Sequence, residues 1–317
     1  MEQKTLKKIA GAVGPLVAGA LALGVGLAKP EHARADAASE AQEKAERCAT
    51  RLSVAFLGKS PSAELLANKD PQSAVESMLS DAGFVERFGR FINSEFNQDP
   101  GEKVEEDASY TMTKYILTND KPWKEMFIGQ YDVTDTVTAD ANGLGYFRSD
   151  AWMRRYAGNE EAGYRIVSAY RIMQNTTGLA LTATTAVEGV DLSATGREAA
   201  GCRGCHYESW YALDKVSRVL STRKGTGANM TFVAPTAGPQ QILGGKTINN
   251  DKELVTALVE STNFRVNATR LAFKFLYGRP ETTCEGATFD KAIDAFDSKG
   301  SIKDAIATIA KDPTFCQ

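Results

Sequence analysis

Apolar side chains recur at helical spacing along most of this chain, so one face of each such segment is predicted to be buried. The clearest segment runs from Ser261 to Tyr277, and Gly278 directly after it is the residue that commonly ends a helix. Two further helices, over 288–298 and 301–311, are predicted to form a terminal hairpin around Gly300. The C-terminal part of the chain is therefore expected to be helical.

The first half of the chain shows the same spacing. Ser39 is expected to cap a helix that Gly58 ends. Phenylalanines repeat along 83–97, and such a stripe is typical of a buried helix face. Shorter helices are predicted over 106–118, 121–129, 149–157 and 160–173. Only 131–137 alternates as a strand does, with a turn signal at Asn142-Gly143, so one short strand or β-hairpin is expected there. The predicted fold class is mainly α.

The stretch from Thr182 to Gly196 is rich in Thr, Ala and Gly and is the best place for a boundary between modules. We therefore expect a helical module over 38–190 and a second helical module over 191–317. One small helical domain needs only about 100 residues. The first module is consequently expected to have a role of its own, which no motif identifies.

The first 35 residues differ from the rest. Three lysines precede an uncharged apolar stretch from Ile9 to Ala28, and Ala33-Arg34-Ala35 matches a small-x-small cleavage pattern. These features predict a signal peptide over 1–35, cut after Ala35 or, in the next frame, after Ala37. An uncleaved anchor is the alternative, because the apolar stretch is just long enough to span a bilayer. Cleavage would give a periplasmic or secreted protein with no stable membrane span.

Composition adds a limit on partners. The chain has a formal net charge of -3, with 43% hydrophobic and 24% charged residues, as in soluble globular proteins. It has no basic block of the kind that binds DNA or RNA, so no nucleic-acid partner is expected. Its mildly acidic balance suggests at most a basic partner protein.

One motif carries chemistry, namely Gly201-Cys202-Arg203-Gly204-Cys205-His206. Cys-x-x-Cys-His is the attachment signature of c-type haem. On a helical turn, thiols at this spacing can reach the two vinyl groups along one edge of a porphyrin, and the next residue directs its imidazole at the iron. We therefore predict one covalent haem c, held by Cys202 and Cys205, with His206 as an axial iron ligand. A predicted export signal supports this, because haem is attached outside the cytoplasm.

Three other interpretations of the motif are weaker. A zinc site would need a second pair of soft ligands, and the sequence has no second Cys-x-x-Cys. A thioredoxin-like redox pair would need a βαβ setting, whereas the surrounding sequence is helical. A plain disulfide between Cys202 and Cys205 would leave His206 unexplained.

The second axial ligand is open. The only other histidine, His32, lies in the predicted leader, and methionine is the usual alternative. Met230, in an expected loop 24 positions after His206, is the preferred candidate for a distal ligand. The other candidates are Met78, Met112, Met126, Met153 and Met173. If none ligates, the iron has an open side for peroxide or a diatomic gas.

Side chains near the motif are expected to surround the haem. Residues 207–222 are predicted to continue as the haem-bearing helix, which places Trp210 and Leu213 against the porphyrin. Arg203 is a candidate partner of the haem propionates, as are Arg197 and Arg218.

Three cysteines lie outside the motif. Cys284 and Cys316 flank the predicted terminal hairpin, and two antiparallel helices of similar length bring their outer ends together. We therefore expect a Cys284–Cys316 disulfide, which an oxidising compartment would support. Cys48 would then be a buried free thiol. Pairing of Cys48 with either of the other two stays open.

Residues 197–280 resemble the C-terminal haem region of large exported cytochrome-like proteins from planctomycetes and myxobacteria, whose functions are largely uncharacterised. Beyond the motif the shared runs are Arg197-Glu198, Gly244-Gly245, Glu253-Leu254 and Leu276-Tyr277-Gly278-Arg279-Pro280. A looser N-terminal match covers Arg51-Leu52, Phe56-Leu57-Gly58 and Pro61. The chain departs from the family at Tyr207-Glu208-Ser209, where a Met-containing segment is common, and at Asn267, where a cysteine is common. The resemblance implies an exported haem protein.

These observations lead to one expected function and two alternatives. The expected function is that of a monohaem c-type cytochrome that passes single electrons between redox partner proteins. The first alternative is a haem enzyme or gas-binding protein with an open distal side. The second is a subunit of a larger electron-transfer assembly, so an oligomer is also considered.

Overall fold

The computed structural model describes residues 30–97, 100–101, 103–156, 165–182 and 188–317. Side chains are described from Ser39 onward, apart from Glu105 and Ala228. Most of the predicted signal peptide, including its apolar stretch, lies outside these residues. Within them, no helix combines the length and the apolar character that a membrane crossing requires.

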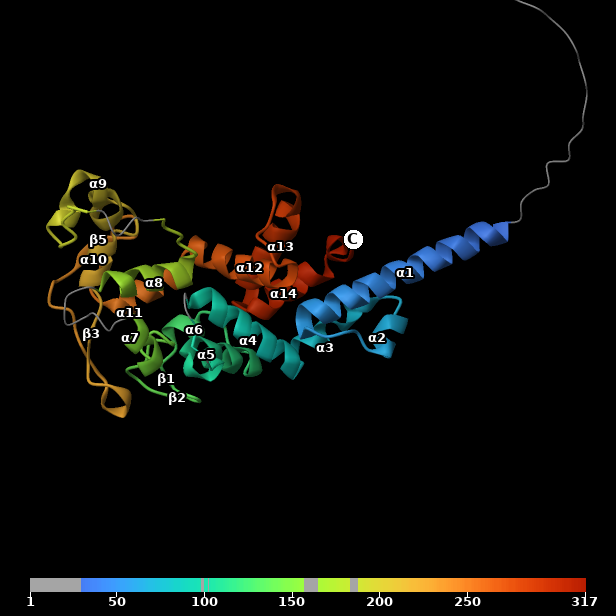
Figure 1. The fold of residues 1–317 in the computed structure, drawn as a ribbon, viewed down its shortest axis with the longest axis horizontal. Helices are drawn as coiled ribbons and strands as arrows, with labels where there is room; N and C mark the ends of the chain where they lie inside the picture. The colour runs from blue at the N-terminus through green and yellow to red at the C-terminus, as the bar shows by residue number, and fades with distance from the viewer. Residues whose placement is uncertain (1–29, 98–99, 102, 157–164, 183–187) are drawn as a thin grey trace, which may run out of the picture. The chain divides into compact units, whose positions relative to one another are not determined.

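The described residues are mainly helical, which confirms the predicted fold class. The α-helices are α1 (Pro30–Leu57), α2 (Ala63–Ala67), α3 (Val75–Leu79), α4 (Ala82–Phe96), α5 (Ala108–Thr118), α6 (Glu125–Ile128), α7 (Asp150–Tyr156), α8 (Ile166–Thr177), α9 (Ala200–Arg203), α10 (Leu213–Arg218), α11 (Asp251–Val259), α12 (Thr262–Tyr277), α13 (Gly286–Lys299) and α14 (Ile302–Lys311). Figure 1 shows their arrangement.

In the described residues, three short antiparallel strand pairs interrupt the helices, where the sequence predicted a single strand or hairpin. They are β1 (Tyr131–Val133) with β2 (Val137–Ala139), β3 (Thr222–Lys224) with β4 (Thr231–Val233), and β5 (Gln240–Ile242) with β6 (Lys246–Ile248). The first pair lies in the expected segment, but its turn is at 134–136 and not at Asn142-Gly143. The other two were missed because three-residue strands are too short to show alternation.

Two helix ends follow the sequence closely and one does not. Ser261 caps α12 by accepting a hydrogen bond from the Phe264 backbone, and Gly278 ends this helix in the left-handed conformation, with φ 69°. Residue Ser39, expected to cap the first helix, instead lies inside α1, because the backbone is already helical from Pro30.

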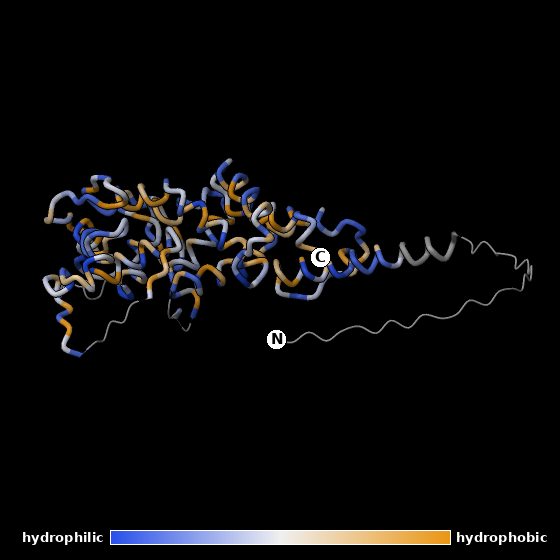
Figure 2. The backbone as a smooth tube through the Cα atoms, turned by 90° about the horizontal axis from the view of Figure 1, so that it is seen from above, coloured by the Kyte–Doolittle hydropathy of each residue, from blue (hydrophilic) through white to orange (hydrophobic). Residues whose placement is uncertain are grey.

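The core of residues 41–317 is built from aromatic and aliphatic faces that the helices turn toward one another. Helix α4 packs on α5 and α12, and α12 also packs on α13 and α14 (Figure 1). Phe84, Phe88 and Phe96 on α4 are fully buried, while Phe91 is half-buried at the edge of the stripe. In Figure 2 hydrophobic and hydrophilic stretches alternate along the helical tube, as expected for amphipathic helices.

One hydrophobic cluster extends through this unit. It includes residues from both expected modules, from Cys48 on α1 to Phe315 at the C-terminus, and helix α8 packs on both α10 and α12. Residues 41–317 form a single compact unit by their contacts. The predicted modules 38–190 and 191–317 thus share a core.

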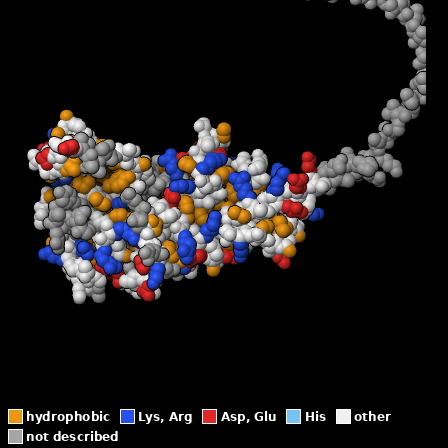
Figure 3. Space-filling view, viewed as in Figure 1, with side chains coloured by type: hydrophobic (Ala, Val, Ile, Leu, Met, Phe, Trp, Pro, Cys, Tyr) orange, Lys and Arg blue, Asp and Glu red, His pale blue; other side chains and the backbone are white. Residues whose placement is uncertain are grey.

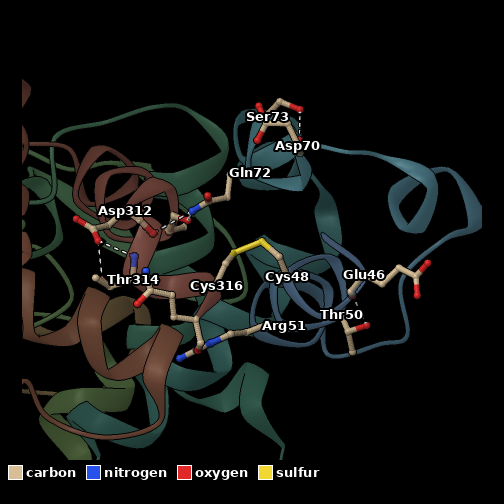
Figure 4. Close-up of a disulfide and its surroundings, with 12 residues drawn as sticks. Glu46, Cys48, Thr50, Arg51, Asp70, Gln72, Ser73, Asp312, Thr314 and Cys316 are labelled. Carbon is tan, nitrogen blue, oxygen red and sulfur yellow. Dashed lines mark hydrogen bonds between the residues drawn. A yellow bond between two sulfur atoms is a disulfide. The ribbon is translucent and has the colours of Figure 1, made fainter. Parts of the chain in front are cut away.

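The expected Cys284–Cys316 disulfide is wrong: Cys316 is bonded to Cys48, with Cα atoms 4.7 Å apart, and Cys284 is a free, exposed thiol (Figure 4). The hairpin of α13 and α14 formed as predicted, but a 3-10 turn from Pro313 redirects the last residues toward α1. Phe315 is fully buried there, with the Arg51 guanidinium 4.6 Å from its ring centre. Cys48 is therefore buried, as expected, but it is not free.

Candidate functional site

The Cys-x-x-Cys-His motif lies on a chain of short turns that precede α10. A 3-10 turn, Gly196–Glu198, leads into α9, and a π-helical turn from Gly204 to Glu208 follows directly. Figure 1 shows α9 and α10 near each other at one side of the ribbon. Cys202 lies on α9, and Cys205 and His206 lie on the π turn that follows it without a break.

The two motif thiols are accessible. Neither is in a disulfide; Cys202 is half-buried and Cys205 is exposed. The Tyr211 hydroxyl donates a hydrogen bond to the Cys205 sulfur at 3.2 Å. This contact and, to a smaller extent, the burial of the hydroxyl raise the pKa of Tyr211. A Cβ added at Gly201 or Gly204 would meet no atom within 4 Å, so open space adjoins the backbone that carries the thiols.

Among the described residues, the His206 imidazole has a hydrogen-bond partner at one nitrogen, Nδ1. Its Nδ1 lies 2.7 Å from Oδ2 of Asp214, on the first turn of α10, and its side chain keeps 21% exposure. An ionised carboxylate can only accept, so Nδ1 must be the donor in this pair. In the neutral ring the lone pair is then on Nε2, which is the form that binds a metal.

Asp214 is itself fixed by Arg197. Arg197 Nε donates to Oδ2 at 2.9 Å and Nη2 to Oδ1 at 2.7 Å, while Nη1 donates to the Leu192 carbonyl. Burial raises the pKa of Asp214, but the bonds and charge of Arg197, together with His206, outweigh it and leave that pKa below its usual value. The Asp214 carboxylate is therefore ionised, as the donor assignment for His206 requires.

The arginines predicted to meet haem propionates have protein partners. Arg197 binds Asp214, as described above. Arg203 forms an exposed ion pair with Glu208 at 2.6 Å, and Arg218 lies over the Tyr207 ring at 5.7 Å. Solvent-exposed Arg203 can exchange its partner at small cost, since such surface pairs contribute little.

The predicted helix over 207–222 is interrupted. After the π turn the backbone becomes extended at Ser209, whose hydroxyl accepts a hydrogen bond from the Ala212 amide, and α10 begins only at Leu213. Leu213 is buried in the protein core, whereas Trp210 is 39% exposed and packs edge-on against Tyr211. Of the two side chains expected against the porphyrin, only Trp210 is available to a ligand.

Met230 lines a cavity to which the motif residues do not contribute. It follows the 3-10 turn Gly227–Asn229 between β3 and β4, and it lines a cavity together with Arg148 and Asp251. None of the three motif residues lines that cavity. The other methionine candidates, Met78, Met112, Met126, Met153 and Met173, are buried in the core. Met230 is thus the accessible methionine of this set, and it lines a cavity that His206 does not line.

The surroundings of the motif fit a covalently attached haem. Besides two free thiols and a His206 ring whose Nε2 has no partner among the described residues, this part of the chain exposes large apolar side chains, Val190, Leu192 and Trp210. Hydrophobic side chains are visible just below the lobe that contains α9 in Figure 3. A flat apolar macrocycle would cover such side chains. Among the described residues, no group of three or more His, Cys, Asp or Glu is placed to hold a metal ion.

Sequence reasoning missed Asp214 and assigned Arg197 a different partner. Asp214 lies eight positions after His206, and an uninterrupted helix would have put it more than two turns away. The break at Ser209 folds the chain back so that the two side chains meet. A buried-helix pattern around Leu213 and Val216 with a single acidic residue inside it was the available signal.

Comparison with known proteins does not identify a family for this chain. No family model matches the chain, and no match is found among curated proteins or among solved structures.

Proposed function

We propose that this chain is an exported monohaem c-type cytochrome that transfers single electrons, with haem attached at Cys202 and Cys205 and His206 as an axial ligand. The observation that carries the proposal is the pairing of two free thiols with an imidazole whose Nδ1 is held by Asp214. This pairing leaves Nε2 as the coordinating atom. A haem would supply the one-electron chemistry.

Attachment would use the thiols as they are. Each thiol would add across one vinyl group of the haem, its sulfur bonding to one carbon and its hydrogen passing to the other, so the step would need no oxidant. Both sulfurs must be reduced beforehand, and in the structure neither is in a disulfide. Trp210 and Leu192, which are exposed, would gain an apolar cover. The donor and acceptor are proposed to be redox proteins outside the cytoplasm.

Expression of the full chain together with a c-type haem maturation system tests the proposal. We expect haem that stays with the polypeptide after denaturation, and a mass increased by one haem. Cys202→Ala combined with Cys205→Ala should abolish attachment, whereas Cys284→Ala, which removes an exposed thiol outside the motif, should leave it intact. Wild-type protein without covalent haem under these conditions would overturn the proposal.

A second candidate function is ligand or peroxide chemistry at an open distal side of the iron. The location of Met230 in a cavity that none of the motif residues lines favours it. Carbon monoxide added to the reduced protein separates the two functions. Fast and complete binding, unchanged by Met230→Leu, supports an open site; a spectrum that carbon monoxide does not alter supports a six-coordinate electron carrier. The assembly-subunit alternative stays a prediction.

A further inference from the structure

We propose that Asp214, fixed by Arg197, is a positioning residue that orients His206 and lowers the reduction potential of the haem. This inference rests on the proposed function. In the protein without haem, the same contact predicts that the neutral His206 ring carries its proton on Nδ1.

The hydrogen bonds around Asp214 fix the orientation of the His206 ring. Asp214 Oδ2 receives hydrogen bonds from both His206 Nδ1 and Arg197 Nε, and Arg197 also fixes the other oxygen. Asp214 is 4% exposed, so water competes little with these bonds. A carboxylate held by a two-pronged guanidinium cannot rotate freely, and the imidazole bonded to it is fixed in turn.

The negative charge of Asp214 would act on the reduction potential of the haem. A carboxylate that accepts from Nδ1 makes the imidazole a stronger electron donor at Nε2, as second-shell carboxylates do for metal-bound histidines. A stronger donor favours the oxidised, more positive iron, and hydrogen bonding to the axial ligand is one of the means by which proteins set haem potentials. The chain therefore has a device for lowering the potential that does not depend on the distal ligand.

A purely structural role for Asp214 is the rival explanation. Through Arg197 the carboxylate ties the turn at Gly196–Glu198 to α10, and losing that tie would loosen the segment. Loosening would lower thermal stability and haem retention, but it would not raise the potential of protein that is folded and loaded. The potential thus distinguishes the two roles.

The first experiment compares two variants that each remove one negative charge close to the motif. Asp214→Asn keeps the size of the side chain and loses the charge on the bond to His206. Glu208→Gln removes an exposed carboxylate two residues from His206 that forms an ion pair with Arg203. We expect the midpoint potential of loaded Asp214→Asn to be clearly more positive than wild type, and that of Glu208→Gln to change less. Equal shifts, or none, would overturn the inference.

Arg197→Lys provides the same test if Asp214→Asn does not fold. It keeps the positive charge but loses the two-pronged grip on Asp214. We expect the midpoint potential of loaded Arg197→Lys to move in the same direction as that of Asp214→Asn, and an unchanged potential would count against the inference. If wild type itself holds no haem, the proposed function fails. The NMR experiment on haem-free protein then still decides whether Asp214 fixes the proton of His206 on Nδ1.

The second experiment uses the protein without haem. The sequence has two histidines, so in a His32→Gln background His206 is the only one. Nitrogen NMR of the neutral ring in the full chain should show the proton on Nδ1. Asp214→Ala should shift it toward Nε2, the form that free imidazole prefers when no acceptor is near. A ring protonated on Nε2 in the unsubstituted site would overturn the inference, whether or not haem is ever attached.

Discussion

The aromatic core around α4 and the segment that carries the motif are stabilised by different forces. Phe88 on α4 is fully buried and has four aromatic rings near it, those of Phe84, Phe91, Trp123 and Phe275. The motif segment consists of turns joined by hydrogen bonds to Asp214 and to the backbone.

The two regions also differ in how many of their apolar side chains are exposed to solvent. In the core, apolar side chains are already packed, and burial of this area is the main source of stability. Near the motif, Val190, Leu192 and Trp210 stay exposed although they are large and apolar. The core is thus stabilised by the burial of apolar side chains, whereas the motif segment leaves apolar side chains exposed, which the proposed haem would cover.

Phe88→Ala should produce the largest effect on stability. Removing a fully buried ring with four aromatic neighbours leaves a cavity, and such changes cost about 3–5 kcal/mol of unfolding free energy. Chemical denaturation monitored by far-UV circular dichroism measures the loss. A loss below about 1 kcal/mol would mean that the aromatic cluster repacks easily, and the contrast between the two regions would then be much weaker.

Removal of the Cys48–Cys316 disulfide should come next. It joins residues 268 positions apart, so it restricts the unfolded chain strongly, and a native disulfide contributes about 2–5 kcal/mol. Cys48→Ala combined with Cys316→Ala should lower the unfolding free energy by an amount in this range, measured under non-reducing conditions. Cys284→Ala is the matched control, since its thiol is free and exposed. Equal effects of the double variant and the control would show that the bond does not form.

The sequence predicts the elements of the core better than their connections. Helix α12 was predicted to within one residue at its start, because its apolar face, its cap at Ser261 and its terminator Gly278 all agree. The α13–α14 hairpin was likewise expected. The partner of Cys316 was not, because Pro313 turns the last residues onto α1, and hairpin geometry alone does not include that turn.

At the candidate site the sequence identifies the chemistry but not its support. Two thiols and a histidine at fixed spacing are recognisable from local sequence. Asp214 is not, because its contact with His206 depends on the break at Ser209 and on a tertiary bond to Arg197. Local spacing describes residues on one helix, and here the chain changes direction between the two partners.

Glu86 makes the stability of the core region depend on pH at the acidic end. Burial raises its pKa, but bonds from Tyr110 at 2.5 Å, Lys114 at 2.9 Å and Arg90 at 2.6 Å outweigh it and lower that pKa from 4.5 to about 2. A lowered folded-state pKa contributes stability above the unfolded value, and that contribution is lost as the pH falls from 4.5 toward about 2.

Glu86→Gln should therefore flatten the fall in stability across this acidic range. The effect at neutral pH should be under about 1 kcal/mol, because the side chain is over one-third exposed and its pairs are screened by solvent. Unfolding free energies at several pH values measure it, and Tyr110→Phe, which removes one of the bonds, should give a partial effect. An unchanged slope in Glu86→Gln would show that this cluster does not contribute to acid sensitivity.

Trp210→Ala should have the smallest effect in the protein without haem, and it tests the comparison from the other side. The ring is 39% exposed, and the Trp210 carbonyl, which accepts a 2.9 Å bond from the Leu243 amide, survives the substitution. The unfolding free energy of haem-free protein should change by no more than about 0.5 kcal/mol. With haem attached, the loss should be larger, because the ring would then be covered by the macrocycle. Equal losses in both forms would mean that Trp210 belongs to the polypeptide's own packing, and that the exposed apolar surface near the motif is not where a haem lies.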